Sequence, residues 1–203
     1  MMTFANKITL FRIISIPFFV ASLIFYTPDR PYLKFIALGI FLLAIISDVV
    51  DGYIARTQRQ KTKAGALLDP LADKALLLTA FIFLYKTSRL YLSVTLPLWV
   101  LLIVISRDAI ILIGSGIILM TNQATQIKPT WWGKLTTFFQ MMTVIGLILE
   151  FKYCWLIWGT ASLFTIISGI DYVRKGINTL NSSTPLTREH DSINHKTNSR
   201  PSY

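Results

Sequence analysis

Six long apolar segments dominate the sequence and limit its possible folds more than any other feature. They lie near residues 8–26, 33–55, 67–86, 94–120, 134–151 and 153–173. An α-helix of about 20 mostly apolar residues can cross the hydrocarbon core of a bilayer. Backbone polar groups in that core must be satisfied inside the protein, which helices achieve by themselves. The sequence therefore predicts an all-α integral membrane protein with six transmembrane helices.

The composition excludes an ordinary soluble domain. The 203 residues are 53% hydrophobic and 15% charged, with a mean hydropathy of +0.56. Polar breaks separate the apolar segments at Thr27–Pro31, Arg56–Lys63, Lys86–Arg89, Thr121–Pro129 and Glu150–Lys152. We expect one membrane domain over residues 1–177, followed by a polar, disordered cytoplasmic tail over residues 178–203.

The distribution of basic residues predicts the orientation in the membrane. Six spans place both termini on one side, and most Lys and Arg residues, Arg12 included, flank that side. The opposite side has only Arg30, Lys34, Lys86, Arg89 and Lys152. By the positive-inside rule, both termini are expected to face the cytoplasm. No cleavable signal or transit peptide is recognisable before Asn6, which favours a bacterial plasma (inner) membrane.

The net charge of +10 also has to be explained. The basic residues flank the apolar segments and form no single stripe, so they fit anionic lipid headgroups as partners and do not predict nucleic-acid binding.

Four aspartates interrupt the apolar framework. Asp48 and Asp51 end the second segment, and Asp69 and Asp73 begin the third. Within each pair the residues are three or four apart, so both can project from one face of a helix. One unpaired Asp at the centre of a spanning helix costs about 2.5–3.5 kcal/mol on insertion scales, so a cation is needed to neutralise the group.

The residue types indicate which cation this is. Carboxylate oxygens without Cys or His favour Mg²⁺, Mn²⁺ or Ca²⁺ over zinc. The single Cys154 cannot form a cysteine cage, and both histidines lie in the polar tail. We therefore predict one or two divalent ions.

Small and basic residues surround these aspartates. Gly52, Ala55 and Gly65 remove side-chain bulk, so a ligand or a helix can approach the backbone closely. Arg56 adds a planar cation suited to phosphate. The combination predicts a diphosphate site.

Asp69 precedes Pro70, so the third helix begins either there, with Asp69 as its cap, or nearer Gly65.

The complete pattern, D-x-x-D-G-x-x-A-R-x8-G-x3-D-x3-D, resembles the signature of the CDP-alcohol phosphotransferase family at every fixed position. Three other segments resemble the family as well: Asn6-x-x-Thr9-x-x-Arg12, Ser106-Arg107-Asp108 and Gly133-Lys134-x-x-Thr137-x-x-Gln140. The resemblance implies a six-span enzyme, commonly a homodimer, that replaces the CMP of a CDP-linked lipid with an alcohol.

The resemblance also implies roles for individual residues. Asp48, Asp51, Asp69 and Asp73 would hold the metal, as two ions of Mg²⁺ or Mn²⁺, and Asp73 would also be the catalytic base. The residues around the cytidine diphosphate would be Gly52, Ala55, Arg56 and Gly65.

Two basic residues indicate which kind of alcohol accepts the phosphatidyl group. Arg107 lies well inside the fourth segment, where a cation is usually functional. Adjacent Asp108 is not expected to pair with it, because neighbouring side chains diverge by about 100° on a helix. Lys134 opens the fifth segment, and either binds the acceptor or extends to the interface. Lys74 is expected to pair with a carboxylate or to reach the interface.

We predict that Arg107 and Lys134 bind the phosphate of glycerol 3-phosphate and that CDP-diacylglycerol is the donor. The Gly-Lys-x-x-Thr-x-x-Gln segment resembles the branch of the family with this acceptor. Asp108 and Thr136 depart from that branch and resemble the one that makes cardiolipin from phosphatidylglycerol.

A function from another class is a cation transporter. Transport sites tend to lie at the bilayer midplane between internal repeats. Here the acids occur once, at one cytoplasmic end, which favours the enzyme. CMP release would distinguish the two functions.

Overall fold

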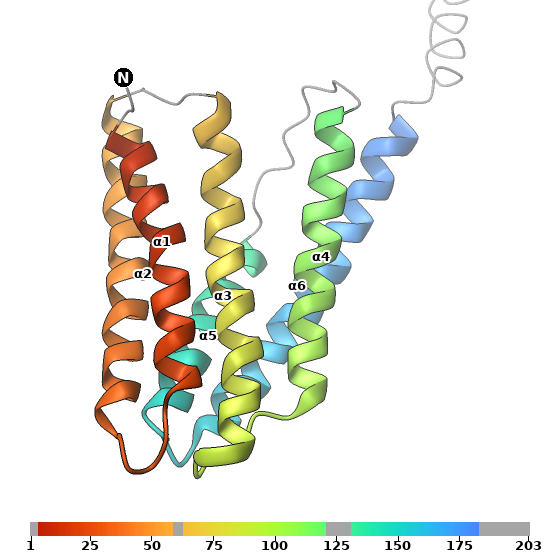
Figure 1. Cartoon of the computed structure of the whole chain (residues 1–203). Coiled ribbons are helices and arrows are strands. Elements are labelled where there is room, and N and C mark those ends of the chain that lie inside the picture. The colour runs from red at the N-terminus through yellow and green to blue at the C-terminus, as the bar shows by residue number, and fades with distance from the viewer. Residues whose placement is uncertain (1–3, 59–62, 121–130, 183–203) are drawn as a thin grey trace, which may run out of the picture.

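The computed structural model describes residues 4–58, 63–120 and 131–182, and it describes side chains at 10–47, 74–114 and 131–175. The described chain forms six α-helices and no strand (Figure 1). They are α1 (Phe4–Ile24), α2 (Tyr32–Gln58), α3 (Lys63–Tyr91), α4 (Leu98–Met120), α5 (Trp131–Ile148) and α6 (Cys154–Ser182). The prediction of an all-α fold is confirmed.

Successive helices run in alternating directions through one bundle (Figure 1). Helix α1 packs against α2 and α3, while α6 packs against α4 and α5. The start of α1 and the end of α6 lie at the same end of the bundle, where α2 also ends and α3 begins. We call this the signature end. The short turns between α1 and α2 and between α5 and α6 lie at the opposite end.

Several predicted boundaries differ from the structure. Lys86–Arg89 was predicted as a break, but α3 continues to Tyr91. Charged residues alone do not end a helix, and this stretch has no Gly or Pro. Helix α3 begins at Lys63, so Asp69 does not cap it, and the alternative start nearer Gly65 was the better one. Helix α6 continues to Ser182, past the end of the sixth apolar segment at 173, while the domain boundary at 177 stays a prediction. The disordered tail stays a prediction, because residues 183–203 lie outside the described residues.

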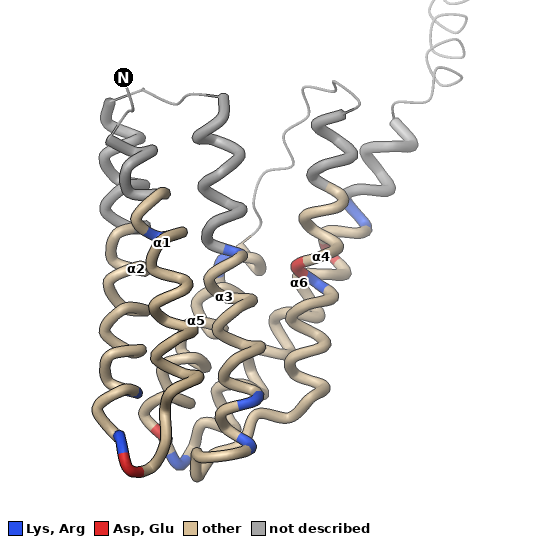
Figure 2. Tube along the Cα trace, in the orientation of Figure 1, with Lys and Arg blue, Asp and Glu red and all other residues tan. Residues whose placement is uncertain are grey.

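The outer surface of the helices is consistent with a membrane protein. Large apolar side chains such as Phe18, Phe35 and Leu102 are exposed. Among the described residues, one stretch is long and apolar enough to be a candidate span, Cys154–Lys175. The shorter stretches Leu10–Ile24 and Tyr32–Ser47 are apolar as well. In Figure 2 an uncharged band separates the charges at the opposite end from those near mid-height. The number of spans stays a prediction.

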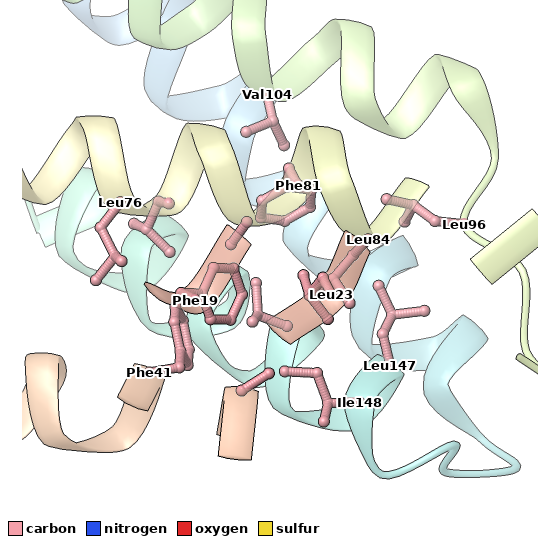
Figure 3. Packing of buried hydrophobic residues seen from close by; sticks show 14 of the residues in the cluster. Phe19, Leu23, Phe41, Leu76, Phe81, Leu84, Leu96, Val104, Leu147 and Ile148 are labelled. Atoms are coloured by element: carbon pink, nitrogen blue, oxygen red, sulfur yellow. The ribbon is translucent and has the colours of Figure 1, made fainter. Parts of the chain in front are cut away.

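The buried centre of the bundle joins side chains from all six helices (Figure 3). The rings of Phe19 and Phe41 lie 5.8 Å apart between α1 and α2, and Phe81 and Leu84 of α3 belong to the same cluster. Val104 of α4 and Leu147 of α5 extend it. Because lipid tails are as apolar as these side chains, close packing is what holds such helices together in a bilayer.

The turn between α5 and α6 contains a residue in an unusual backbone conformation. The Phe151 N–H donates to the Gly146 carbonyl at 2.9 Å and the Glu150 N–H to the Leu147 carbonyl at 3.1 Å, which forms a Schellman motif. Glu150 is the residue of this motif whose backbone adopts the left-handed conformation, with φ of 54°. Glycine usually holds this position, because a side chain is strained there.

The Glu150 carboxylate compensates by connecting three segments. It accepts hydrogen bonds from Lys34 Nζ of α2 at 2.6 Å and from the backbone N–H of Ser93, between α3 and α4, at 3.0 Å. These bonds, with the Lys34 bond the largest cause, lower the pKa of Glu150 from 4.5 to about 2. Glu150 thereby links the α5–α6 turn to α2 and to the segment between α3 and α4, at the end of the bundle opposite to the signature end.

We expect Glu150→Gln to lower the melting temperature by about 1–3 °C at pH 7, as for a partly exposed ion pair. A carboxyl whose pKa is lowered by folding stabilises the protein above pH 4.5. That stabilisation is lost as the pH falls from 4.5 towards 2, so the difference between wild type and variant should shrink over this range. Thermal unfolding in detergent at several pH values measures this difference in melting temperature.

Asp29→Asn, at an exposed position of the same end of the bundle, is the control. A pH-independent difference would contradict the role of the ionised pair.

Candidate active site

The signature residues lie on two helix ends at one end of the bundle. The last turns of α2 carry Asp48, Asp51, Gly52, Ala55 and Arg56, and the first turns of α3 carry Gly65, Asp69 and Asp73. Both stretches lie at the signature end (Figure 1). Their helical backbone places the members of each Asp pair on one face. Their side chains lie outside the described residues, so their roles stay predictions.

The structure describes the side chains of a second group of candidate site residues, and Lys74 of α3 is the first of them. Lys74 Nζ lies 2.9 Å from Asp108 Oδ1, which confirms that Lys74 pairs with a carboxylate. Asp108 is 3% exposed. Because Lys74 directly follows Asp73, this ion pair joins α4 to the part of α3 that carries the predicted base.

Arg107 is 6% exposed and shares the same carboxylate. Its Nη1 donates to Asp108 Oδ1 at 2.7 Å, and its Nη2 donates to Ser168 Oγ of α6 at 2.8 Å. The expectation that Asp108 would not pair with Arg107 was therefore wrong. The two Cα–Cβ bonds diverge, but the long Arg side chain bends back far enough to reach its neighbour. A Cβ at Gly169 would lie 3.6 Å from Arg107 Cγ, so α6 lies close to the Arg107 stem.

Two polar atoms of this pair have no hydrogen-bond partner in the described structure. They are Arg107 Nε and Asp108 Oδ2, and both are buried. A guanidinium with an unused N–H can bind an oxyanion. A carboxylate oxygen with no donor can accept from a hydroxyl. The network of Lys74, Arg107, Asp108 and Ser168, here called the α4 network, can therefore receive a ligand that carries both groups.

Lys134 has no hydrogen bond or ion pair with the α4 network among the described side chains. It is exposed on the first turn of α5, and its Nζ lies 5.6 Å from the centre of the Trp131 ring. Trp131 is itself exposed. No hydrogen-bonded partner is common to Lys134 and Arg107 in the described structure, and their shared role in binding the acceptor phosphate stays a prediction.

Sequence reasoning assigned no site role to two polar residues that the structure buries. Arg12, counted among the flanking cations, is 1% exposed inside α1 and lines a pocket of about water size with Leu77 and Met141. Gln140 is 0% exposed on α5, and neither atom of its amide has a partner in the described structure. The available signal was a polar residue within an apolar segment.

No group of three or more His, Cys, Asp or Glu side chains that could hold a metal occurs among the described side chains. The predicted metal ligands are not among them, so this finding leaves the four-aspartate prediction untested.

The helical bundle and the signature on α2 and α3 are those expected of a lipid-directed phosphotransferase. Residues 2–167 match the family model described as CDP-alcohol phosphatidyltransferase. The chain belongs to the CDP-alcohol phosphatidyltransferase family, as the resemblance of its motifs indicated.

Curated relatives carry more specific names. The chain is 36% identical to the "CDP-diacylglycerol--glycerol-3-phosphate 3-phosphatidyltransferase" of Haemophilus influenzae over 71% of this chain and 75% of the relative. It is 35% identical to the Escherichia coli K12 protein of the same name, over 74% of each chain. A "Probable phosphatidylglycerophosphate synthase" of Mycobacterium tuberculosis is 30% identical over 85% of this chain and 81% of the relative.

Proposed function

We propose that the chain transfers the phosphatidyl group of CDP-diacylglycerol to glycerol 3-phosphate, releasing phosphatidylglycerophosphate and CMP. The observation that carries this proposal is the similarity of most of the chain to relatives named for that reaction. The buried Arg107, with its unpartnered Nε, supports an anionic acceptor. Its connection through Asp108 to Lys74 relates it to the signature residues on α3.

The residues present fit a divalent metal by their chemistry. Asp48, Asp51, Asp69 and Asp73 supply only carboxylate oxygens, which suit Mg²⁺ or Mn²⁺. When bound, such ions neutralise phosphate oxygens and favour in-line displacement.

The chain's own residues account for binding and proton transfer. Gly52, Ala55, Arg56 and Gly65 hold the cytidine diphosphate, and Arg107 holds the acceptor phosphate. Asp73 takes the proton of the acceptor's primary hydroxyl as that oxygen bonds to the lipid-linked phosphorus. The bond from this phosphorus to the bridging oxygen breaks, and CMP leaves with that oxygen.

The proposal includes an orientation in the membrane. Six spans would place the signature end and both termini at the cytoplasmic side of a bacterial inner membrane, where water-soluble glycerol 3-phosphate is available. The active unit would be a homodimer. Alkaline phosphatase fused after residue 203 should stay inactive, because that reporter requires export; an active fusion would contradict the orientation.

We expect Arg107→Gln to raise the apparent KM for glycerol 3-phosphate roughly 10- to 100-fold, as expected for the loss of a charge-assisted hydrogen bond. Lys134→Gln should raise it less, because Lys134 is exposed beside Trp131. The KM for CDP-diacylglycerol should change little in either variant. Saturation curves for both substrates, on variants with unchanged melting temperature, measure the difference. Arg174→Gln, at an exposed cation of α6, is the control.

A panel of acceptors tests the proposed reaction itself. Purified protein receives CDP-diacylglycerol, Mg²⁺ and, in parallel, glycerol 3-phosphate, phosphatidylglycerol, inositol, inositol phosphate or serine, and lipid products are identified by mass. We expect phosphatidylglycerophosphate. If only phosphatidylglycerol reacts and cardiolipin forms, the proposed acceptor is wrong, and Asp108 and Thr136 were the better guide. If no acceptor leads to CMP release, the transferase assignment fails.

A further inference from the structure

The Asp108 carboxylate uses its two oxygens unequally. Oδ1 accepts from both Lys74 and Arg107, while Oδ2 has no donor in the described structure. The side chain is only 4% exposed. A buried carboxylate oxygen without a donor is unfavourable, because burial removes the water that would otherwise bind it.

The Arg107 guanidinium, which is bonded to Asp108, also has a buried polar atom without a hydrogen-bond partner, and this atom is a donor. Arg107 Nε is a buried donor without an acceptor, and Arg107 joins Asp108 through a bond of 2.7 Å. A phosphate at Arg107 would satisfy Nε but leave Oδ2 without a donor. A molecule with a phosphate and a nearby free hydroxyl would satisfy both atoms, which is the chemistry of a polyol phosphate.

The α4 network also holds these two atoms in place. Lys74 binds Oδ1 of Asp108, and Ser168 binds Nη2 of Arg107. Turning the carboxylate away from Lys74, or turning the guanidinium away from Ser168, would break at least one of these bonds. Groups fixed by their neighbours discriminate between ligands better than mobile ones do.

We propose that Asp108 is a specificity residue whose Oδ2 accepts a hydrogen bond from the unreacted secondary hydroxyl of the acceptor. This inference rests on the proposed function, because it places the acceptor phosphate at Arg107. In glycerol 3-phosphate the secondary hydroxyl lies on the carbon between the phosphate-bearing carbon and the carbon with the reacting hydroxyl. An acceptor without it would leave Oδ2 without a donor.

The test compares glycerol 3-phosphate with 3-hydroxypropyl phosphate, which retains the phosphate and the primary hydroxyl but lacks the secondary one. The kcat/KM of each acceptor is measured with the full-length purified protein and saturating CDP-diacylglycerol. We expect the wild type to prefer glycerol 3-phosphate roughly 10- to 100-fold, as for the loss of a hydrogen bond to a charged group. Equal use of the two acceptors overturns the inference and leaves the proposed function intact.

Variants then separate hydroxyl recognition from support of Arg107. Asp108→Asn and Asp108→Ala should reduce the preference to within about threefold, mainly by loss of activity on glycerol 3-phosphate. Ser168→Ala, which removes a bond to Arg107 but leaves Asp108 unchanged, should weaken both acceptors in parallel and keep the preference. Asp171→Asn, in an exposed pair with Lys175, is the matched control for the loss of a carboxylate.

Two results would count against the inference. If the Asp108 variants slow both acceptors equally, Asp108 only positions Arg107. If the wild type does not use glycerol 3-phosphate at all, the proposed function fails and the inference fails with it.

Discussion

Asp73→Asn should lower the rate of CMP release by at least about 10²- to 10⁴-fold, the range typical of losing a general base. The substitution retains the shape of the side chain but removes the proton acceptor and one ligand charge. Initial rates with CDP-diacylglycerol and excess glycerol 3-phosphate measure the loss. Asp73 lies on α3 directly before Lys74, whose bond to Asp108 is part of the described structure.

A control must show that the loss is chemical. Asp171→Asn removes a carboxylate from an exposed i,i+4 pair on α6 and should retain wild-type rates. Both variants should elute and melt like the wild type. A folded Asp73→Asn variant with near wild-type turnover would remove Asp73 from the mechanism.

Removing divalent cations should abolish turnover, and adding Mg²⁺ or Mn²⁺ in excess of the chelator should restore it. The reason is the signature itself, in which four aspartates in an apolar framework need a cation that prefers oxygen ligands. CMP release is followed in EDTA and after each metal is added back. Full activity in excess chelator would contradict the metal-site prediction.

A second readout separates metal binding from folding. Circular dichroism in EDTA should show unchanged helix content, because the described core of α1 to α6 is built from apolar side chains. If the helices are lost together with the activity, the cation is needed for the fold, and its role in the reaction would not follow from chelation.

The helical framework was predictable because it depends on local sequence. The apolar segments determined the number of helices, and the turn signals at Thr27–Pro31 and Glu150–Lys152 marked two breaks that the structure contains. The prediction was wrong at Lys86–Arg89, where charges resembled a loop but α3 continues. Helix ends depend on capping bonds as well as polarity. Here Ser88 Oγ accepts from the Leu96 N–H beyond the helix end.

The candidate site was only partly predictable. Its signature is contiguous enough to be read along the chain, and family membership followed from it. The hydrogen-bond partners of Arg107 could not be predicted from the sequence. Sequence spacing argued against Asp108 as its partner, and it gave no means of finding Ser168, which lies 61 positions away.

The sequence by itself determined the helical framework and the kind of chemistry, because apolar length and carboxylate spacing act within a few turns of one helix. The tertiary structure alone decided which buried charges meet. Lys74 of α3, Asp108 of α4 and Ser168 of α6 come together only when three helices pack. Glu150 likewise meets Lys34 across 116 positions. A buried charge must find its partner in space, and distance along the chain does not set that choice.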